Sequence, residues 1–381
     1  MRMPHAEPVP PRPMSSLTKT WRRVFALASV LLWLGIFVAA LYPFAFHPRN
    51  DVNWVEGGLG FGRHGIVLSQ GPFLTESSGD NSSCSIEIFL KPGSLVGFDK
   101  FLVFLNPAHS EQLTLTQFRD GIVIWRQSGQ GKHRRADERG VGHFFNSWQP
   151  MLLTITSGQK GSVVYSNGRP LERFPSFSLS RLAMNGILVF GTDTAHINTW
   201  SGQLRGLALY ARELSPQEVA ANFQNWLLAS GAHWNDDPSR FALFTFRGGL
   251  GTVIRNLSPG EPDLVIPPSY LLPSKPFLVL PWDEFRSDWD YVNDLIRNVL
   301  GFVPLGFAVC GYFSLTGNKK AVLVAVVMGA LTSLCIEVLQ GFIPQRESGT
   351  TDVLTNTLGT VLGAFLVQSG PLRRFLQPRQ I

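Results

Sequence analysis

Hydrophobic and polar positions are arranged in two different ways along the chain. Four long apolar segments with few charges cover about residues 24–46, 294–315, 321–343 and 351–368. A helix of about 20 apolar residues spans the roughly 30 Å hydrocarbon core of a bilayer. The pattern therefore predicts four transmembrane helices, the last of which begins with polar residues.

The first apolar segment has an alternative interpretation, a cleaved signal peptide, because basic residues precede it. The apolar region of a signal peptide is only about 7–15 residues long, and small residues follow it at the cleavage site. Residues 24–46 carry no charge, and the segment leaves the predicted helix through Leu41-Tyr42-Pro43-Phe44. A retained membrane anchor is the favoured interpretation.

Between the first and second apolar segments the hydrophobic period changes to two. Short alternating strands are predicted at residues 85–90, 101–105, 122–125 and 151–156, which is the pattern of a β-sandwich. Asn167-Gly168 follows a further strand and predicts a type I′ hairpin turn, whose two central residues need positive φ. Residues 241–246 and 263–266 are expected to add strands that pack on this sandwich.

The charge distribution predicts the orientation of the chain in the membrane. A net charge of +6 is compatible with nucleic-acid binding, but the basic residues concentrate beside the apolar segments, as at cytoplasmic helix flanks. They are Arg2, Arg12, Lys19, Arg22, Arg23, Lys319, Lys320, Arg373, Arg374 and Arg379. We therefore expect a multi-pass membrane protein with both termini in the cytoplasm, an extracytoplasmic β-domain and no nucleic-acid partner.

These patterns predict a mixed fold, in which an all-β sandwich is inserted into a four-helix transmembrane bundle. The expected parts are a cytoplasmic tail (1–23), a first transmembrane helix (24–46), the β-sandwich (50–229), an extracytoplasmic connector (230–290), a domain of three transmembrane helices (291–370) and a second cytoplasmic tail (371–381). Cys84, Cys310 and Cys335 are too scattered to predict a disulfide framework or a metal site.

The β-segment resembles the laminin-G-like, concanavalin A-like jelly rolls. The matching features are Trp148 with the strand that follows it, the runs 164–168 and 187–191, the closing strand 201–210 and the short helix at 214–219. The resemblance implies a module that binds a cell-envelope polysaccharide or serves as a spacer.

The acidic residues of this segment offer little catalytic chemistry. Glycoside hydrolases use two carboxylates about 5–9 Å apart, whereas Glu87 is the single acid of its strand. Asp80, Asp120 and Asp193 lie in or near predicted turns, where carboxylates either solvate the turn or bind Ca²⁺. Asp80 and Asp193 are the calcium candidates, and no other cofactor is expected.

Polar side chains occur in the C-terminal apolar segments, where a simple anchor would avoid them. The candidate binding residues are Asn298, Glu337, Gln340, Arg346, Asp352 and Asn356. The predicted topology places all of them in the outer leaflet, and we expect Arg346 to form an ion pair with Glu337 or with Asp352. Gly359 and Gly363 form a GxxxG pair, which favours close packing of helices.

At these residues the chain resembles the VanZ-like membrane family. The similar positions are the run 298–306 with Glu337, Gln340, Phe342, Pro344, Arg346, Asp352, Asn356, Gly359 and Gly363, together with Tyr42-Pro43-Phe44 near the first helix. The resemblance implies that the β-domain interrupts a helical unit and that the protein lies in the bacterial cytoplasmic membrane. Gly349 departs from the family pattern, in which many members carry an acid or Ser. The family is named for a teicoplanin-resistance accessory protein, and this name states no molecular mechanism. The resemblance therefore defines the fold better than the function.

Three functional hypotheses remain open. A non-catalytic envelope protein would bind a lipid or a lipid-linked glycan headgroup through its helices and a polysaccharide through its jelly roll, with a link to glycopeptide tolerance. A membrane enzyme would use Glu337 or Asp352 as a general base and Arg346 to hold a phosphate. Alternatively, the polar residues form a structural network and the β-domain is an adhesion module. We favour a non-enzymatic role, because the sequence shows no nucleophile, metal triad or cofactor loop.

Overall fold

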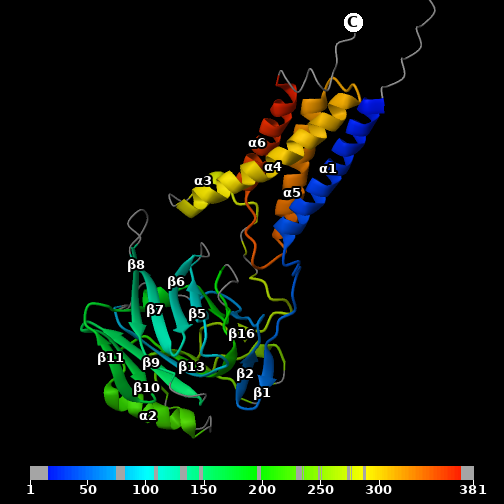
Figure 1. Cartoon of the computed structure of the whole chain (residues 1–381). Helices are drawn as coiled ribbons and strands as arrows, with labels where there is room; N and C mark the ends of the chain where they lie inside the picture. Colours follow the sequence, from blue (N-terminus) through cyan, green and yellow to red (C-terminus); the bar gives the residue numbers. More distant parts are fainter. Residues whose placement is uncertain are drawn as a thin grey trace, which may run out of the picture. The chain divides into compact units, whose positions relative to one another are not determined.

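The predicted alternation of strands is observed in the computed structural model of the chain, which contains two antiparallel sheets and a group of long helices (Figure 1). The chain divides into two compact units, which are described separately: Met1–Phe46 with Pro276–Ile381, and His47–Lys275. The structure describes residues 16–73, 82–106, 110–128, 135–145, 149–194, 199–228, 236–247, 251–272, 277–285 and 289–369, together with Trp234, Gly249 and Lys275.

The first sheet has the strand order β1-β2-β13-β4-β9-β10-β11, and β14 pairs with β13. Its strands are β1 (Asn53–Val55), β2 (Gly58–Phe61), β4 (Cys84–Pro92), β9 (Met151–Gly158), β10 (Gly161–Ser166), β11 (Arg169–Phe174), β13 (Gly202–Tyr210) and β14 (Arg240–Thr245). At the predicted hairpin between β10 and β11, Asn167 and Gly168 have φ values of 50° and 79°, as a type I′ turn requires.

The second sheet has the strand order β15-β16-β3-β12-β5-β6-β7-β8. Its strands are β3 (Val67–Ser69), β5 (Phe98–Leu105), β6 (Glu111–Phe118), β7 (Gly121–Ser128), β8 (Arg135–Val141), β12 (Ile187–Phe190), β15 (Val253–Ile254) and β16 (Leu264–Val265), and a 3-10 helix η2 (Arg181–Met184) precedes β12. One buried apolar cluster joins residues of both sheets, so the predicted β-sandwich is confirmed.

The sandwich extends beyond its predicted end at residue 229. Strand β14 pairs with β13, and β16 pairs with β3, so part of the predicted connector belongs to the sheets. The backbones of Arg49 and Ser269 form an isolated bridge, which places the beginning and the end of this unit side by side. A boundary at 229 would therefore cut through the sandwich.

Both faces of strand β4 are covered, which explains why all but one of its residues are buried. Ile86, Ile88 and Leu90 belong to the core between the sheets. Phe89 lies in a separate cluster with Trp226 of helix α2 (Pro216–Leu227). Helix α2 begins with a capping box between Ser215 and Glu218, which satisfies backbone N–H groups of its first turn.

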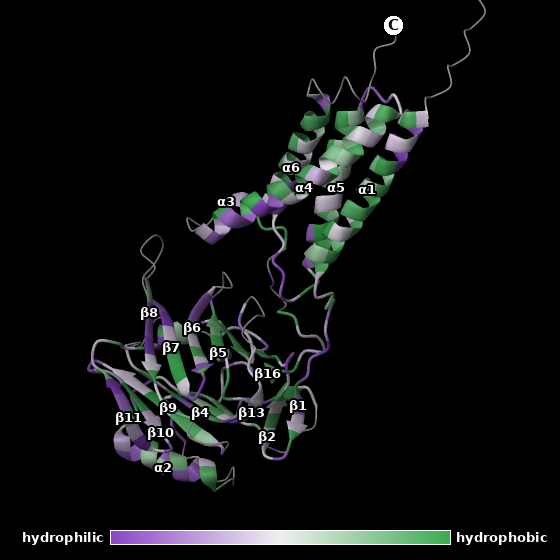
Figure 2. Cartoon of the chain, in the orientation of Figure 1, coloured by the Kyte–Doolittle hydropathy of each residue, from purple (hydrophilic) through white to green (hydrophobic). Residues whose placement is uncertain are grey.

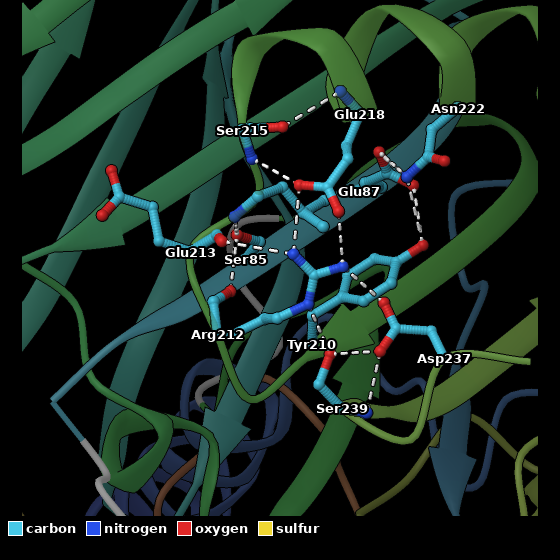
Figure 3. Close-up of polar contacts among 11 residues, drawn as sticks. Ser85, Glu87, Tyr210, Arg212, Glu213, Ser215, Glu218, Asn222, Asp237 and Ser239 are labelled. Atoms are coloured by element: carbon cyan, nitrogen blue, oxygen red, sulfur yellow. Dashed lines mark hydrogen bonds and ion pairs between the residues drawn. The ribbon is translucent and has the colours of Figure 1, made fainter.

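Glu87 lies on the outer face of β4, beneath α2, and is fully buried. Its carboxylate accepts hydrogen bonds from Asn222 Nδ2 at 3.1 Å and the Tyr210 hydroxyl at 3.4 Å (Figure 3). It also accepts one from Trp226 Nε1 at 3.1 Å. Burial raises the pKa of Glu87 to about 7, although these donors and the charge of Arg240 oppose the shift. Ala208 and Thr154 are its cross-strand neighbours, so Glu87 anchors α2 and is not part of a carboxylate pair across adjacent strands.

Replacing Glu87 by Gln should remove a pH dependence of the stability of the sandwich. Between about pH 4.5 and 7, Glu87 binds a proton in the folded chain but not in the unfolded chain, so stability falls as pH rises through this window and levels off above it. The full effect is on the order of 3 kcal/mol. Thermal unfolding of the full-length protein at several pH values measures this slope. Glu172→Gln, at an exposed position of β11, should keep it, and an unchanged slope in Glu87→Gln would contradict the assignment.

The helical unit contains α1 (Ser16–Leu41), α3 (Pro281–Glu284), α4 (Trp289–Leu315), α5 (Ala321–Gln340) and α6 (Thr350–Gln368). Figure 2 shows that hydrophobic residues predominate along α1, α4, α5 and α6. Helix α1 ends at Leu41 and not at the predicted residue 46, because Pro43 follows and has no N–H to continue the helix. Helix α4 begins earlier than predicted, at Trp289, and α5 ends earlier, at Gln340.

The structure supports three of the four predicted transmembrane helices. Among the described helices, α1, α4 and α5 are long and apolar enough to cross a membrane. Helix α6 is not, because its buried face carries polar residues such as Asn356 and Thr360. The predicted GxxxG pair nevertheless packs tightly: a Cβ atom at Gly359 or Gly363 would collide with the carbonyl oxygen of Val299 or Val303 on α4.

Candidate functional site

The first turn of α6 is held by two carboxylates from other elements. Glu337, near the end of α5, accepts a hydrogen bond from the Gly349 backbone N–H at 2.9 Å, and Glu284 of α3 accepts one from Thr351 at 3.2 Å. Gly349 is the N-cap residue of α6 and makes no side-chain cap. The two acids therefore bind N–H groups that have no partner within the helix, and negative charge is favourable at this end of the helix dipole.

Asp352 joins this cluster from α6 itself. One of its carboxylate oxygens accepts a hydrogen bond from Asn298 Nδ2 of α4 at 2.7 Å. One turn further along α6, Asn356 donates to the Ser333 hydroxyl of α5 at 2.9 Å. The structure therefore unites four of the six predicted site residues, Asn298, Glu337, Asp352 and Asn356, on helices α4, α5 and α6. We call these four residues and Glu284 the α6 cluster.

Glu284 was not singled out from the sequence. A β-bridge between Val279 and Gly349 brings its segment to α6, and Gly349 leaves the necessary space, because a Cβ atom there would overlap the Glu284 carboxylate. The Glu284 carboxylate of α3 thus lies beside the backbone of Gly349. The only local signal is a helix start, in which Pro281 is followed by the acids Asp283 and Glu284.

The expected ion pair of Arg346 with Glu337 or Asp352 is wrong. The Arg346 guanidinium donates to the carbonyl oxygen of Tyr42 at 2.8 and 3.0 Å and to that of Ala39 at 3.3 Å. Gln340 donates to the Ala40 carbonyl at 3.0 Å. These carbonyls close helix α1 and lack partners within it, so Arg346 and Gln340 cap α1 and are not members of the α6 cluster.

The calcium candidates of the β-unit have different surroundings. Asp193 is buried and lies 3.6 Å from Lys100 Nζ, which also binds Glu111 at 2.8 Å. Asp120 lies 2.6 Å from His143 Nδ1, and Asp80 lies outside the described residues. In the part of the chain that the structure describes, no three His, Cys, Asp or Glu residues are grouped so that they could hold a metal ion.

Two family models match separate parts of the chain. Residues 263–371 match the model described as VanZ/LLP1. This matched segment contains the whole α6 cluster. Residues 69–220 match a model described as the concanavalin A-like lectin/glucanases superfamily. The helical part is VanZ-like, and the β-unit is a concanavalin A-like jelly roll. Both resemblances predicted from the sequence are thereby confirmed, whereas no curated protein matches the chain.

Solved structures resemble the jelly roll at low identity. A Bacteroides ovatus protein described as carbohydrate-binding is 10% identical, with a TM-score of 0.34 over 52% of this chain and 55% of that one. The binding domain of botulinum neurotoxin serotype D is 12% identical, with a TM-score of 0.33 over 47% of this chain and 45% of that one. A Ruminococcus gnavus IT-sialidase CBM40, bound to α2,3-sialyllactose, is 12% identical, with a TM-score of 0.33 over 46% of this chain and 97% of that one. The chain spans about half the length of the first two.

Because Arg346 and Glu337 have different partners, their contributions to stability should be additive. Replacing Arg346 by Gln removes charged donors from the end of α1 and should cost about 1–2 kcal/mol, since the side chain is half-buried. The double variant with Glu337→Gln should equal the sum of the single changes within about 0.5 kcal/mol. Thermal unfolding in detergent of the four proteins measures this, with Arg297→Gln as the exposed control. A clear coupling energy between the two substitutions would instead indicate that Arg346 and Glu337 form an ion pair.

Proposed function

We propose that this protein is a non-catalytic envelope protein that binds the headgroup of a lipid or of a lipid-linked glycan through the α6 cluster. The observation that carries the proposal is the convergence of polar side chains from α3, α4, α5 and α6 at one helix end, although carboxylates are costly at the membrane edge. Hydrogen-bonding capacity remains unused there: Thr351 Oγ1 and Asn356 Oδ1 are buried without a partner.

We further propose that α6 completes a four-helix transmembrane bundle. Its most exposed side chains are apolar, among them Leu354, Leu358, Leu362 and Phe365, whereas its polar residues Asn356 and Thr360 are buried against other helices. A helix of this kind faces lipid with an apolar surface and keeps its polar groups inside the bundle. With the basic flanks in the cytoplasm, the α6 cluster lies in the outer leaflet of the cytoplasmic membrane.

Reporter fusions test this orientation. We expect fusions at Gly317 and at the C-terminus to report a cytoplasmic location, and a fusion at Gly168 to report an extracytoplasmic one, because Lys and Arg flank the cytoplasmic ends of membrane helices. An alkaline phosphatase and a fluorescent reporter at each site give opposite signals and control for expression. A cytoplasmic signal at Gly168 would contradict the outer-leaflet location.

The jelly roll is proposed to bind a cell-envelope polysaccharide, in line with the lectins included in the description of its family model. A changed tolerance of glycopeptide antibiotics would be a cellular consequence of binding lipid-linked glycan. The enzymatic alternative needs Arg346 to bind a phosphate. The Arg346 guanidinium instead donates to the carbonyls of Ala39 and Tyr42.

Native mass spectrometry of the full-length protein in detergent tests headgroup binding. We expect a co-purifying lipid whose occupancy falls at least several-fold in Asp352→Asn, because the substitution alters the acceptor that Asn298 and the ligand share. The matched control is Asp290→Asn, at an exposed position of the first turn of α4. Equal lipid occupancy in all three proteins would leave the α6 cluster with a structural role only.

A further inference from the structure

Any negative charge in the α6 cluster is not balanced by side-chain cations among the described residues. Glu284, Glu337 and Asp352 all contact the single turn formed by residues 349–352 or belong to it, and none of them forms an ion pair with a described Lys, Arg or His. Two basic residues of the same unit are engaged elsewhere: Arg346 binds carbonyls of α1, and Arg297 lies 3.6 Å from Asp294. Backbone N–H groups offset only part of this charge, because a helix N-terminus carries roughly half an elementary charge.

Unused hydrogen-bonding atoms provide a second, independent observation. Thr351 and Asn356 are only 8% and 5% exposed, and Thr351 Oγ1 and Asn356 Oδ1 have no partner. Both residues belong to the network of the cluster: the Thr351 N–H binds Glu284, and the Asn356 amide binds Ser333, whose hydroxyl lies 3.5 Å from the Asp352 carbonyl oxygen. Buried polar atoms normally have partners, so these two are available to a bound group.

We propose that the α6 cluster binds a primary ammonium group, an inference that rests on the proposed headgroup-binding function and specifies its ligand. An ammonium has three N–H donors and no acceptor. The cluster offers matching acceptors: one oxygen of each carboxylate is not used in the contacts described, and the Asn356 oxygen is free. Charge-assisted hydrogen bonds of this kind are the strong ones.

Other headgroup chemistries fit the cluster less well. A phosphate would face three carboxylates without an arginine available to bind it, since the Arg346 guanidinium already caps α1. Two sources present a primary ammonium at the membrane surface: the headgroup of an aminophospholipid and a non-acetylated hexosamine of a lipid-linked glycan.

Lipid titrations of the full-length protein in detergent, followed by native mass spectrometry, test the inference. The probes are phosphatidylethanolamine, phosphatidylcholine, whose ammonium has no N–H, and phosphatidylglycerol, which has no ammonium. We expect the first to bind at least about tenfold more tightly than the other two, a difference of about 1.4 kcal/mol. Glu284→Gln and Glu337→Gln should each reduce this preference several-fold, and Asp290→Asn should keep it.

A further variant keeps the inference testable if the two Gln variants do not fold. Gly349→Ala keeps every charge but displaces the Glu284 carboxylate, so it should also weaken the preference for phosphatidylethanolamine. Competition by glucosamine, but not by N-acetylglucosamine, would assign the ammonium to a hexosamine. Failure of both sugars to compete would assign it to the phospholipid.

Two results would overturn the proposal of ammonium binding and leave the proposed headgroup binding intact. One is equal affinity for the three lipids, or a preference unchanged in both Gln variants, which would mean that the carboxyl groups are protonated or purely structural. The other is tighter binding of phosphatidylglycerol that is lost in Arg346→Gln. Binding of no lipid by any form of the protein would instead refute the proposed function itself.

Discussion

The helical unit depends on one constraint: the backbone groups at a helix end have no partner within the helix and need one from elsewhere in the chain. At the N-terminus of α6 the partners are carboxylates, because the free groups there are N–H donors. At the C-terminus of α1 they are Arg346 and Gln340, because the free groups are carbonyl acceptors. Glu337, Gln340 and Arg346 all lie at the end of α5 or shortly after it, so this short stretch joins both helix ends.

This arrangement separates two roles that look alike in the sequence. The basic residue and one amide stabilise the packing of α1, whereas the acids and the other amides gather around α6. A site assembled at a helix end can hold charge without a side-chain counterion, since the helix itself contributes part of the balancing charge. A bound molecule can supply the rest of the balancing positive charge. The same acids would then both stabilise the helix end and recognise a ligand.

Local patterns in the sequence predicted the elements well. The alternation of Ile86, Ile88 and Leu90 placed β4, and Asn167-Gly168 located a hairpin whose turn depends on residues adjacent in the chain. The group of Asn298, Glu337, Asp352 and Asn356 was also predictable, because buried polar residues are conspicuous in apolar helices. The failures involve contacts distant in sequence. Glu284 reaches α6 through a bridge between Val279 and Gly349, which no periodicity reveals.

The error over Arg346 has a different physical origin. Side-chain charges are visible in a sequence, whereas the carbonyls that end a helix are not, so electrostatic reasoning selected Glu337 as the partner. The guanidinium instead donates to the backbone carbonyls of Tyr42 and Ala39, which have no partner within helix α1. The hydropathy of α6 was similarly overestimated, because polar residues such as Asn356 and Thr360 lie on its buried face, whereas its most exposed side chains are apolar.

The capping of α1 by Arg346 also bears on the order of events during synthesis. Ala39 and Tyr42 emerge from the ribosome about 300 residues before the arginine that binds them. Domains generally fold as the chain is made, so the jelly roll has time to form while the end of α1 still lacks its protein partner. The end of α1 thus lacks this cap until the segment after α5 has been made, and a chain that ends before Arg346 lacks the cap altogether.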